Sequence, residues 1–344
     1  MTRARDQIIS LDDTVYYHCM ARCVRRAYLF GEDSLTGRKY DHRKAWVVDK
    51  LAFLADVFAI DVCAYAVMSN HYHVVLRVDV ESCANWSMDE VIERWTSLFA
   101  GNALVARYVS KEATSKAEID KVAEYADEWR ERLCDISWFM RVLNESIARM
   151  ANEEDDCKGR FWEGRFKSQA LLDEAAVLAC MVYVDLNPIR AGVAKLPEDS
   201  DFTSIQTRLN ELASRGVGRP KKNSHNKSNQ QTGQRKAPNL YQFNTGVDLK
   251  EGENALAFSI KDYLQLIDWT GRAIKNEKSG FIPGNAPPIL ARLNMDSQKW
   301  LRFVPEVEKS FNRAIGSREA MMKFAERLDM CWLHGQSVSH SIYT

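Results

Sequence analysis

The sequence predicts an α+β protein in which a mainly antiparallel sheet is flanked by helices. Three observations support this fold class. Segments with β-pattern alternate with segments of helical periodicity. Two adjacent β-segments are close enough in the chain to form a hairpin. The chain has 344 residues, 46% of them hydrophobic, which is enough to bury a sizeable core and to form two domains.

The elements follow in a clear order. The segment 14–24 is β-rich, and 42–60 places Trp46, Val47 and Leu51 on one helical face. A Ser-Asn pair joins two short alternating segments, and Pro188 is expected to end the last helix because proline cannot continue the hydrogen-bond ladder. The expected elements are a strand over 14–24, a helix over 42–60, strands over 61–67 and 71–80, a charged and mostly helical insertion over 84–135, a helix over 136–151, a basic-aromatic extended segment over 161–172 and a helix over 171–187.

The charge distribution suggests the domain boundary. The 47 basic and 47 acidic residues balance, which argues against a general polyanion binder. The stretch 215–236, however, has seven basic residues, no acidic residue and few apolar ones. Such a composition is typical of a disordered linker. We therefore expect a catalytic domain over 1–212, a basic linker over 213–237 and a helical C-terminal region over 238–344.

Composition also limits the location of the protein. No apolar run reaches the roughly 20 residues needed to span a bilayer, and the N-terminus lacks a signal-peptide core. The eight cysteines are scattered without a Cys-x-x-Cys pair, so buried, reduced thiols are expected. We expect a cytoplasmic protein that does not contact membranes.

The most informative motif is His71-Tyr72-His73. Side chains alternate along a strand, so His71 and His73 face the same way and can bind one cation. Tyr72 and Val74 lie on the opposite, more apolar face. The alternative is a pair of hydrogen-bonded structural histidines.

A second motif joins Tyr183 to Asn187, which are four residues apart and so share a helical face. The amide of Asn187 is an oxygen ligand suited to Mg²⁺ or Mn²⁺. The phenol of Tyr183 is a candidate nucleophile. A packed tyrosine and a helix end before proline are the structural alternatives.

A third motif, Phe161 to Lys167, interleaves cations with aromatic rings. This pattern offers phosphate contacts and stacking surfaces for unpaired bases. An ordinary amphipathic strand would look the same.

Taken together, these motifs resemble the REP-associated tyrosine transposases, within the single-tyrosine HUH transposases of insertion-sequence type. The resemblance covers about residues 10 to 205 and preserves the order of the motifs. It rests on Tyr17-His18, Met68-Ser69-Asn70-His71-Tyr72-His73, Phe161-Trp162-Glu163-Gly164-Arg165-Phe166 and Tyr183-x-x-x-Asn187-Pro188-x-Arg190-Ala191-Gly192. The segment from Tyr263 to Arg272 resembles the extension of longer members.

The resemblance implies a ferredoxin-like antiparallel sheet of HUH endonuclease type, acting on single-stranded DNA with hairpin or palindromic repeats. His71, His73 and Asn187 would bind Mg²⁺ or Mn²⁺, and Tyr183 would attack DNA to form a 5′-phosphotyrosine. No nucleotide cofactor is implied. The protein would be a monomer or homodimer.

The expected DNA contacts are Arg22, Arg165, Lys167 and Arg190, with Arg190 serving either a phosphate or a helix-end carbonyl. Arg22 and His18 lie on the expected first strand. Their alternative roles are contact with DNA, contact with the residues around the metal, or packing within the sheet, and His18 is not counted among the metal ligands. Gly218 to Lys222 weakly resembles a minor-groove hook, and a merely solubilising tether is the alternative. We expect a chain ending near Ser214 to cleave DNA still, with weaker and less salt-sensitive binding.

Two other classes remain open. One is a transposase-derived DNA-binding regulator without cleavage. The other is a replication-initiator or relaxase-type nicking enzyme, although Asn187-Pro188-x-Arg190 favours the transposase branch.

Overall fold

The computed structural model describes residues 9–24, 37, 40–112, 115–216, 237–244, 255–275 and 286–342. Most of the expected basic linker, including Gly218 to Lys222, lies outside these residues.

A five-stranded sheet forms the centre of the molecule, in the order β2-β3-β1-β4-β5. Its strands are β1 (Tyr16–Arg22), β2 (Ile60–Val67), β3 (His71–Val78), β4 (Lys167–Leu171) and β5 (Ala314–Ile315). The first four pair antiparallel, and β5 pairs parallel to β4. β2 and β3 form the expected hairpin, closed by the bond from the Met68 N–H to the His71 carbonyl (2.9 Å).

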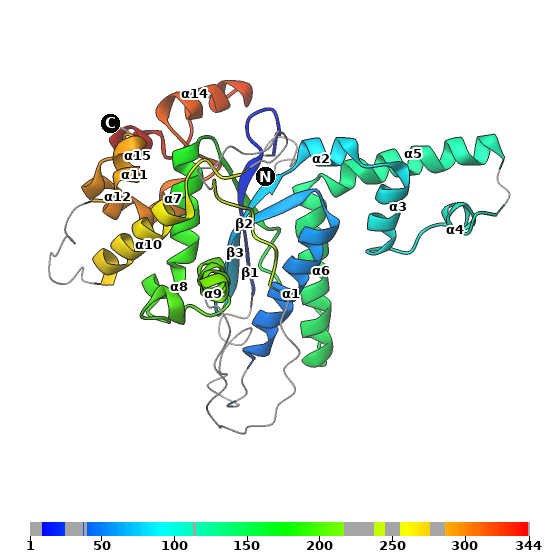
Figure 1. The fold of residues 1–344 in the computed structure, drawn as a ribbon, viewed down its shortest axis with the longest axis horizontal. Helices are drawn as coiled ribbons and strands as arrows, with labels where there is room; N and C mark the ends of the chain where they lie inside the picture. Colours follow the sequence, from blue (N-terminus) through cyan, green and yellow to red (C-terminus); the bar gives the residue numbers. More distant parts are fainter. Residues whose placement is uncertain are drawn as a thin grey trace.

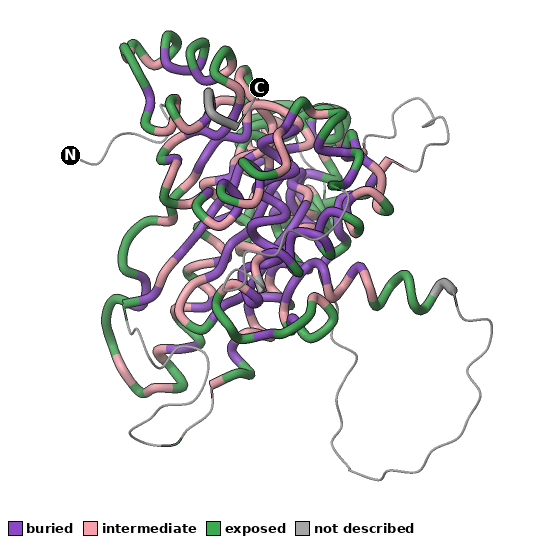
Figure 2. The backbone as a smooth tube through the Cα atoms, turned by 90° about the vertical axis from the view of Figure 1, so that its left-hand side faces the viewer, coloured by how far each residue is buried: buried purple, intermediate pink, exposed green. Residues whose placement is uncertain are grey.

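Helices cover both faces of this sheet (Figure 1). α1 (His42–Val57) and α6 (Ile136–Glu154) pack on one face, where the Tyr72 hydroxyl donates to the side chain of Asn144 at 2.8 Å. α7 (Glu174–Asp185) packs on the other face, against β2, β3 and β4. Figure 2 shows the buried residues gathered in the centre of the molecule. The alternation of β3 therefore sends Tyr72 towards α6 and the histidines towards α7.

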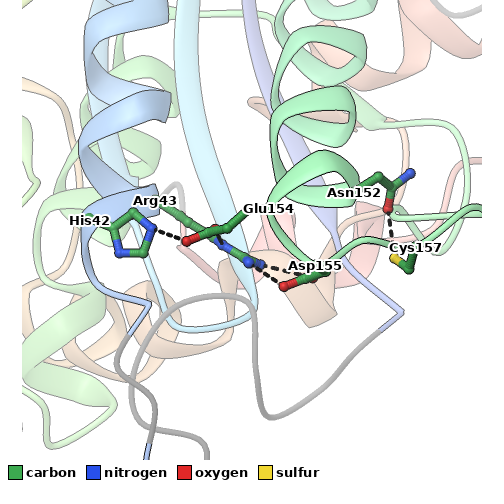
Figure 3. A network of polar contacts seen from close by, with 6 residues as sticks. All are labelled: His42, Arg43, Asn152, Glu154, Asp155 and Cys157. Carbon is green, nitrogen blue, oxygen red and sulfur yellow. Dashed lines mark hydrogen bonds and ion pairs between the residues drawn. The ribbon is translucent and has the colours of Figure 1, made fainter.

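The start of α1 is tied to the end of α6 by a polar network (Figure 3). The guanidinium of Arg43, which is only 1% exposed, donates to Glu154 and to Asp155, each at 2.5 Å. His42 contacts the other oxygen of Glu154 at 2.7 Å. A buried cation needs paired acceptors of this kind, so the network fixes how the two helices cross.

The charged stretch after β3 is helical, as expected, and forms an arm that projects from the body (Figure 1). Ser87 and Ser115 begin two of its helices as capping boxes with Glu90 and Glu118. Trp95 stacks on Trp129 at 5.6 Å inside the arm. The helices are α2 (Val80–Asn85), α3 (Met88–Thr96), α4 (Ala103–Val109) and α5 (Lys116–Leu133).

The helix that carries Tyr183 ends earlier than expected. α7 stops at Asp185, Leu186 leaves the helical region with φ −89° and ψ 1°, and α8 (Asn187–Arg190) begins as a new short helix. Pro188 lies in the first turn of α8, so the prediction that it ends the preceding helix is wrong. Proline is tolerated at this position because the first N–H groups of a helix have no internal acceptor.

The C-terminal region packs onto the part of the chain that precedes residue 217. β5 extends the central sheet through the bonds from the Ala170 N–H to the Arg313 carbonyl (2.8 Å) and from the Leu172 N–H to the Ile315 carbonyl (2.9 Å). The helical elements from residue 197 onward are η2 (Pro197–Asp199), α9 (Ser204–Gly216), α10 (Ile260–Lys275), α11 (Pro288–Arg292), α12 (Ser297–Phe303), η4 (Val304–Glu306), α13 (Val307–Ser310), α14 (Arg318–Arg327) and α15 (Gln336–Ile342).

Two compositional expectations can be compared with the fold. In the part of the chain that the structure describes, no helix is both long enough and apolar enough to cross a membrane. All eight cysteines are free thiols, and five of them are buried.

Candidate active site

His71 and His73 lie side by side on β3, on the face that α7 covers. Their ring centroids are 4.9 Å apart, and the ring planes are nearly perpendicular. His73 is completely buried, whereas His71, at the start of the strand, is partly exposed. The structure thus brings together the two imidazoles that the alternation pattern selected.

A third histidine, His18 on β1, completes the group. Its Nε2 lies 2.9 Å from Nδ1 of His73, and its Nδ1 lies 2.7 Å from Oε1 of Gln169 on β4. Gln169 is the direct cross-strand partner of His18, so both side chains extend from the same face of the sheet. The sequence placed His18 near the site without a defined role, and it did not identify Gln169.

These contacts determine where the protons lie. Nε2 of Gln169 donates to the carbonyl of Phe311 (2.6 Å), so Oε1 faces His18 and accepts from its Nδ1–H. Nε2 of a neutral His18 is then an acceptor for the Nδ1–H of His73. Nε2 of His73 is left with a lone pair, and this buried atom has no hydrogen-bond partner among the described residues.

His71 carries its proton on the same ring nitrogen, Nδ1. Its Nδ1 donates to Oδ1 of Asn70 at 2.6 Å, which leaves its Nε2 as an acceptor. Burial is the main cause that lowers the pKa of His18, His71 and His73, and that of His71 falls to about 4. The rings are therefore neutral near pH 7, the form in which imidazole binds metals.

Tyr183 on α7 faces these rings and is only 2% exposed. Its ring centroid lies 5.5 Å from that of His73 and 6.2 Å from that of His18. The guanidinium carbon of Arg190 lies 4.4 Å from the centre of the phenol ring. Burial raises the pKa of Tyr183, Glu308 raises it further, and Arg190 opposes the shift. The phenol is thus protonated at rest.

The hydroxyl of Tyr183 donates to the carboxylate of Glu308 at 2.8 Å. Glu308 belongs to α13, and its neighbours Pro305 and Phe311 accept hydrogen bonds from Arg190 (2.6 Å) and Gln169 (2.6 Å). Part of the C-terminal region therefore contacts the candidate nucleophile, which counts against the expectation that a chain ending near Ser214 contains the whole site. The sequence contained no motif around Glu308 that marked it.

Asn187 is placed differently from expectation. Because the helix breaks at Leu186, Tyr183 and Asn187 belong to two helices, so their spacing of four residues does not by itself place them on one helical face. Asn187 is buried, and its amide makes no hydrogen bond within the described parts of the chain. Its role as a ligand stays a prediction.

Three of the four expected DNA contacts meet at one pocket. Arg22, Arg165 and Lys167 line a hollow of about 340 Å³ together with Glu163 and Glu308. Arg190 lies instead against Tyr183 and donates to the Pro305 carbonyl, close to the helix-end alternative considered for it. The basic pocket therefore opens beside the partner of the Tyr183 hydroxyl.

The metal site needs a separate test. Across the described ranges, no group of three or more His, Cys, Asp and Glu side chains is arranged to hold a metal ion. The unpaired Nε2 of His73 and the acceptor Nε2 of His71 nevertheless fit two nitrogen ligands on one side of a cation. A larger cavity of about 580 Å³ lies between α8, α9 and α10 and is lined by none of these residues.

The comparisons with known proteins give little beyond this geometry. No family model and no curated protein matches the chain. The chain is similar to a solved structure described as "Structure of the REP associates tyrosine transposase bound to a REP hairpin". The identity is 14% and the TM-score 0.35, and the match covers 68% of this chain and 98% of that one. A similarity at this level is no basis for assigning function.

Proposed function

We propose that this chain is a metal-dependent single-strand DNA endonuclease and strand transferase, a transposase of the single-tyrosine HUH type. One observation carries the proposal: a buried tyrosine packs against His73, and the Nε2 atoms of His73 and of the adjacent His71 are free to bind a cation. We also assign the β1-α1-β2-β3-α6-β4 core to the ferredoxin-like fold, because its strand order and antiparallel pairing follow the β-α-β-β-α-β pattern.

His71 and His73 would hold Mg²⁺ or Mn²⁺, with Asn187 as the proposed third ligand. The chemistry that such a cation supplies when bound is polarisation of the scissile phosphate and neutralisation of its developing charge. His18 and Gln169 keep His73 in the tautomer that leaves Nε2 unprotonated. The chain thus orients its own ligands before any metal or DNA arrives.

The substrate would be single-stranded DNA carrying a hairpin. Arg22, Arg165 and Lys167 would hold a backbone phosphate in the basic pocket, close to the phenol of Tyr183. Attack by Tyr183 would form a 5′-phosphotyrosine and release a 3′-hydroxyl, a covalent intermediate that conserves the bond for rejoining.

The test is the substitution Tyr183→Phe, which removes only the hydroxyl. The variant should fold and bind hairpin DNA like the wild type, because the ring packing is retained. It should form no covalent adduct with labelled hairpin DNA in Mn²⁺ on a denaturing gel. Treatment of the wild type with EDTA should also abolish the adduct.

The outcomes separate the open classes. An adduct that maps to a tyrosine other than Tyr183 would overturn the assignment of the nucleophile. Binding without an adduct under any divalent metal would favour the regulator that binds without cleaving. Nicking followed only by resealing of the cleaved strand, with no transfer to a second strand, would favour the replication-initiator or relaxase class.

A further inference from the structure

The phenol of Tyr183 has one hydrogen-bond acceptor within the described chain, the Oε2 of Glu308 at 2.8 Å. The two residues are 125 positions apart in the sequence. The nearby ring nitrogens are engaged elsewhere: both nitrogens of His18 and Nδ1 of His73 form the relay to Gln169. The remaining Nε2 atoms of His71 and His73 are the proposed metal ligands.

The position of Glu308 is fixed from both sides. Three residues before it, the carbonyl of Pro305 accepts from Arg190 (2.6 Å), and three residues after it, the carbonyl of Phe311 accepts from Gln169 (2.6 Å). Val307 and Phe311 are buried in the core. Two residues of the catalytic part therefore bind the backbone around Glu308 independently of the bond to Tyr183.

We infer that Glu308 is a catalytic residue supplied by the C-terminal region, and that it accepts the proton of Tyr183 during attack on DNA. This inference rests on the proposed function. As the bond between the Tyr183 oxygen and phosphorus forms, the phenol proton passes to the carboxylate of Glu308 and the bond from phosphorus to O3′ breaks. The proton then reaches the departing O3′ through water, giving the 3′-hydroxyl. Rejoining reverses these transfers.

The surroundings of Glu308 favour this role over that of a side chain that only blocks the Tyr183 hydroxyl. In donating its proton to Glu308, the phenol oxygen keeps its lone pairs for attack. Glu308 also lines the pocket that contains Arg22, Arg165 and Lys167, so a phosphate held there lies beside the proton acceptor. The guanidinium of Arg190 over the ring stabilises the phenolate character that develops as the proton leaves.

The decisive variant is Glu308→Gln in the full-length chain, because glutamine keeps the shape and can accept the hydrogen bond but is a far weaker base. With labelled hairpin DNA and Mn²⁺, single-turnover formation of the Tyr183 adduct should slow about 100-fold or more. Binding of the hairpin and of Mn²⁺ should stay within about twofold of the wild type. Added formate should restore part of the rate to Glu308→Ala, since a small carboxylate can enter the space left by the side chain.

Glu306→Gln is the matched control: it makes the same charge change two residues away, where Glu306 pairs with Lys309 on the surface. Its adduct rate should equal that of the wild type. Equal rates for Glu308→Gln and Glu306→Gln, or a faster rate for Glu308→Gln, would overturn the inference. So would loss of Mn²⁺ binding by Glu308→Gln, which would make Glu308 a ligand. A wild-type protein that forms no adduct would instead refute the proposed function.

Discussion

At the scale of single residues, the site depends on which nitrogen of each histidine carries a proton. A ring nitrogen that donates to a neighbour leaves the other one unprotonated, so Asn70 prepares His71, and Gln169 prepares His73 through His18. Each ring is neutral because burial disfavours its charged form and no carboxylate of the described residues hydrogen-bonds to it. The same features that prepare a ligand therefore make protonation of the folded protein unfavourable.

The lowered pKa of His71 makes the free energy of unfolding depend on pH. Burial and the neighbouring Arg22 lower the pKa of His71 from 6.5 to about 4 in the folded state. Above pH 6.5 neither the folded nor the unfolded chain binds this proton, so the full stability is present. Between pH 6.5 and 4 only the unfolded chain binds it, so the free energy of unfolding should fall as the pH falls, on the order of 1 kcal/mol per pH unit.

Urea unfolding of metal-free wild type and His71→Gln at pH 7.5, 6.0 and 5.0 measures this effect. The variant should show a shallower loss below pH 6.5, because its side chain does not titrate. His18 and His73, whose pKa values are lowered too, remain in both proteins, so the difference between the two curves reports the loss of His71 and of its effect on His73. Parallel curves for the two proteins would refute the prediction.

The sequence revealed the residues whose relation is local. The alternation of β3 predicted that His71 and His73 share a face, because the side-chain period of a strand is two. The roles of His18 and Gln169 depend on the register between strands, which no local pattern encodes. Glu308 and Tyr183 are 125 residues apart in the sequence, so their contact could not be predicted from a local pattern either.

At the scale of elements, Asp185 fixes the end of the helix that presents Tyr183. Its carboxylate accepts from the Ile205 N–H (3.0 Å) and from the Ser204 hydroxyl at the start of α9, and from the Tyr263 hydroxyl on α10 at 2.5 Å. Burial raises the pKa of Asp185 to about 6, although the bonds from Ser204 and Tyr263 oppose this shift. Tyr263 belongs to the C-terminal motif that resembles the extension of longer transposases, and this contact gives it a structural role.

Tyr263→Phe should therefore destabilise the fold by about 1–3 kcal/mol, because one oxygen of a fully buried carboxylate loses its donor. Chemical denaturation at pH 7.5 measures the change. Tyr125→Phe is the control, since Tyr125 stacks on Trp129 in the arm and its hydroxyl bonds to none of the described residues. Equal stabilities of the two variants would show that the bond to Asp185 contributes little.

At the scale of the whole molecule, the C-terminal region packs as part of the same body as the central sheet. It adds β5 to the sheet edge, packs α10 and α13 against α7, and brings Glu308 to the Tyr183 hydroxyl. The linker composition predicted two separable parts. That prediction missed the packing because a break in composition shows where the chain leaves one domain but not what the following residues pack against. Buried residues such as Tyr263 and Trp300 show that the packing is extensive.

Truncation after Ser214 should accordingly do more than weaken DNA binding. The shortened chain would expose the β4 edge and the faces of α7 that α10 and α13 cover, so it should melt at a lower temperature and bind a hydrophobic dye. Adduct formation should fall about 100-fold or more even in the fraction that folds, because Glu308 is absent. Differential scanning fluorimetry and the denaturing gel assay measure the two effects.

A control tests whether packing alone, without the covalent link through the linker, keeps the C-terminal region in place. A full-length protein with a specific protease site placed within residues 217–236 can be cut after folding, which leaves both parts present. If packing holds the C-terminal region in place, the cut protein should elute as one species and keep the wild-type adduct rate, while the truncated chain does not. A truncated chain that melts and reacts like the full-length protein would instead show that residues 238–344 form an independent unit that contributes nothing to the site.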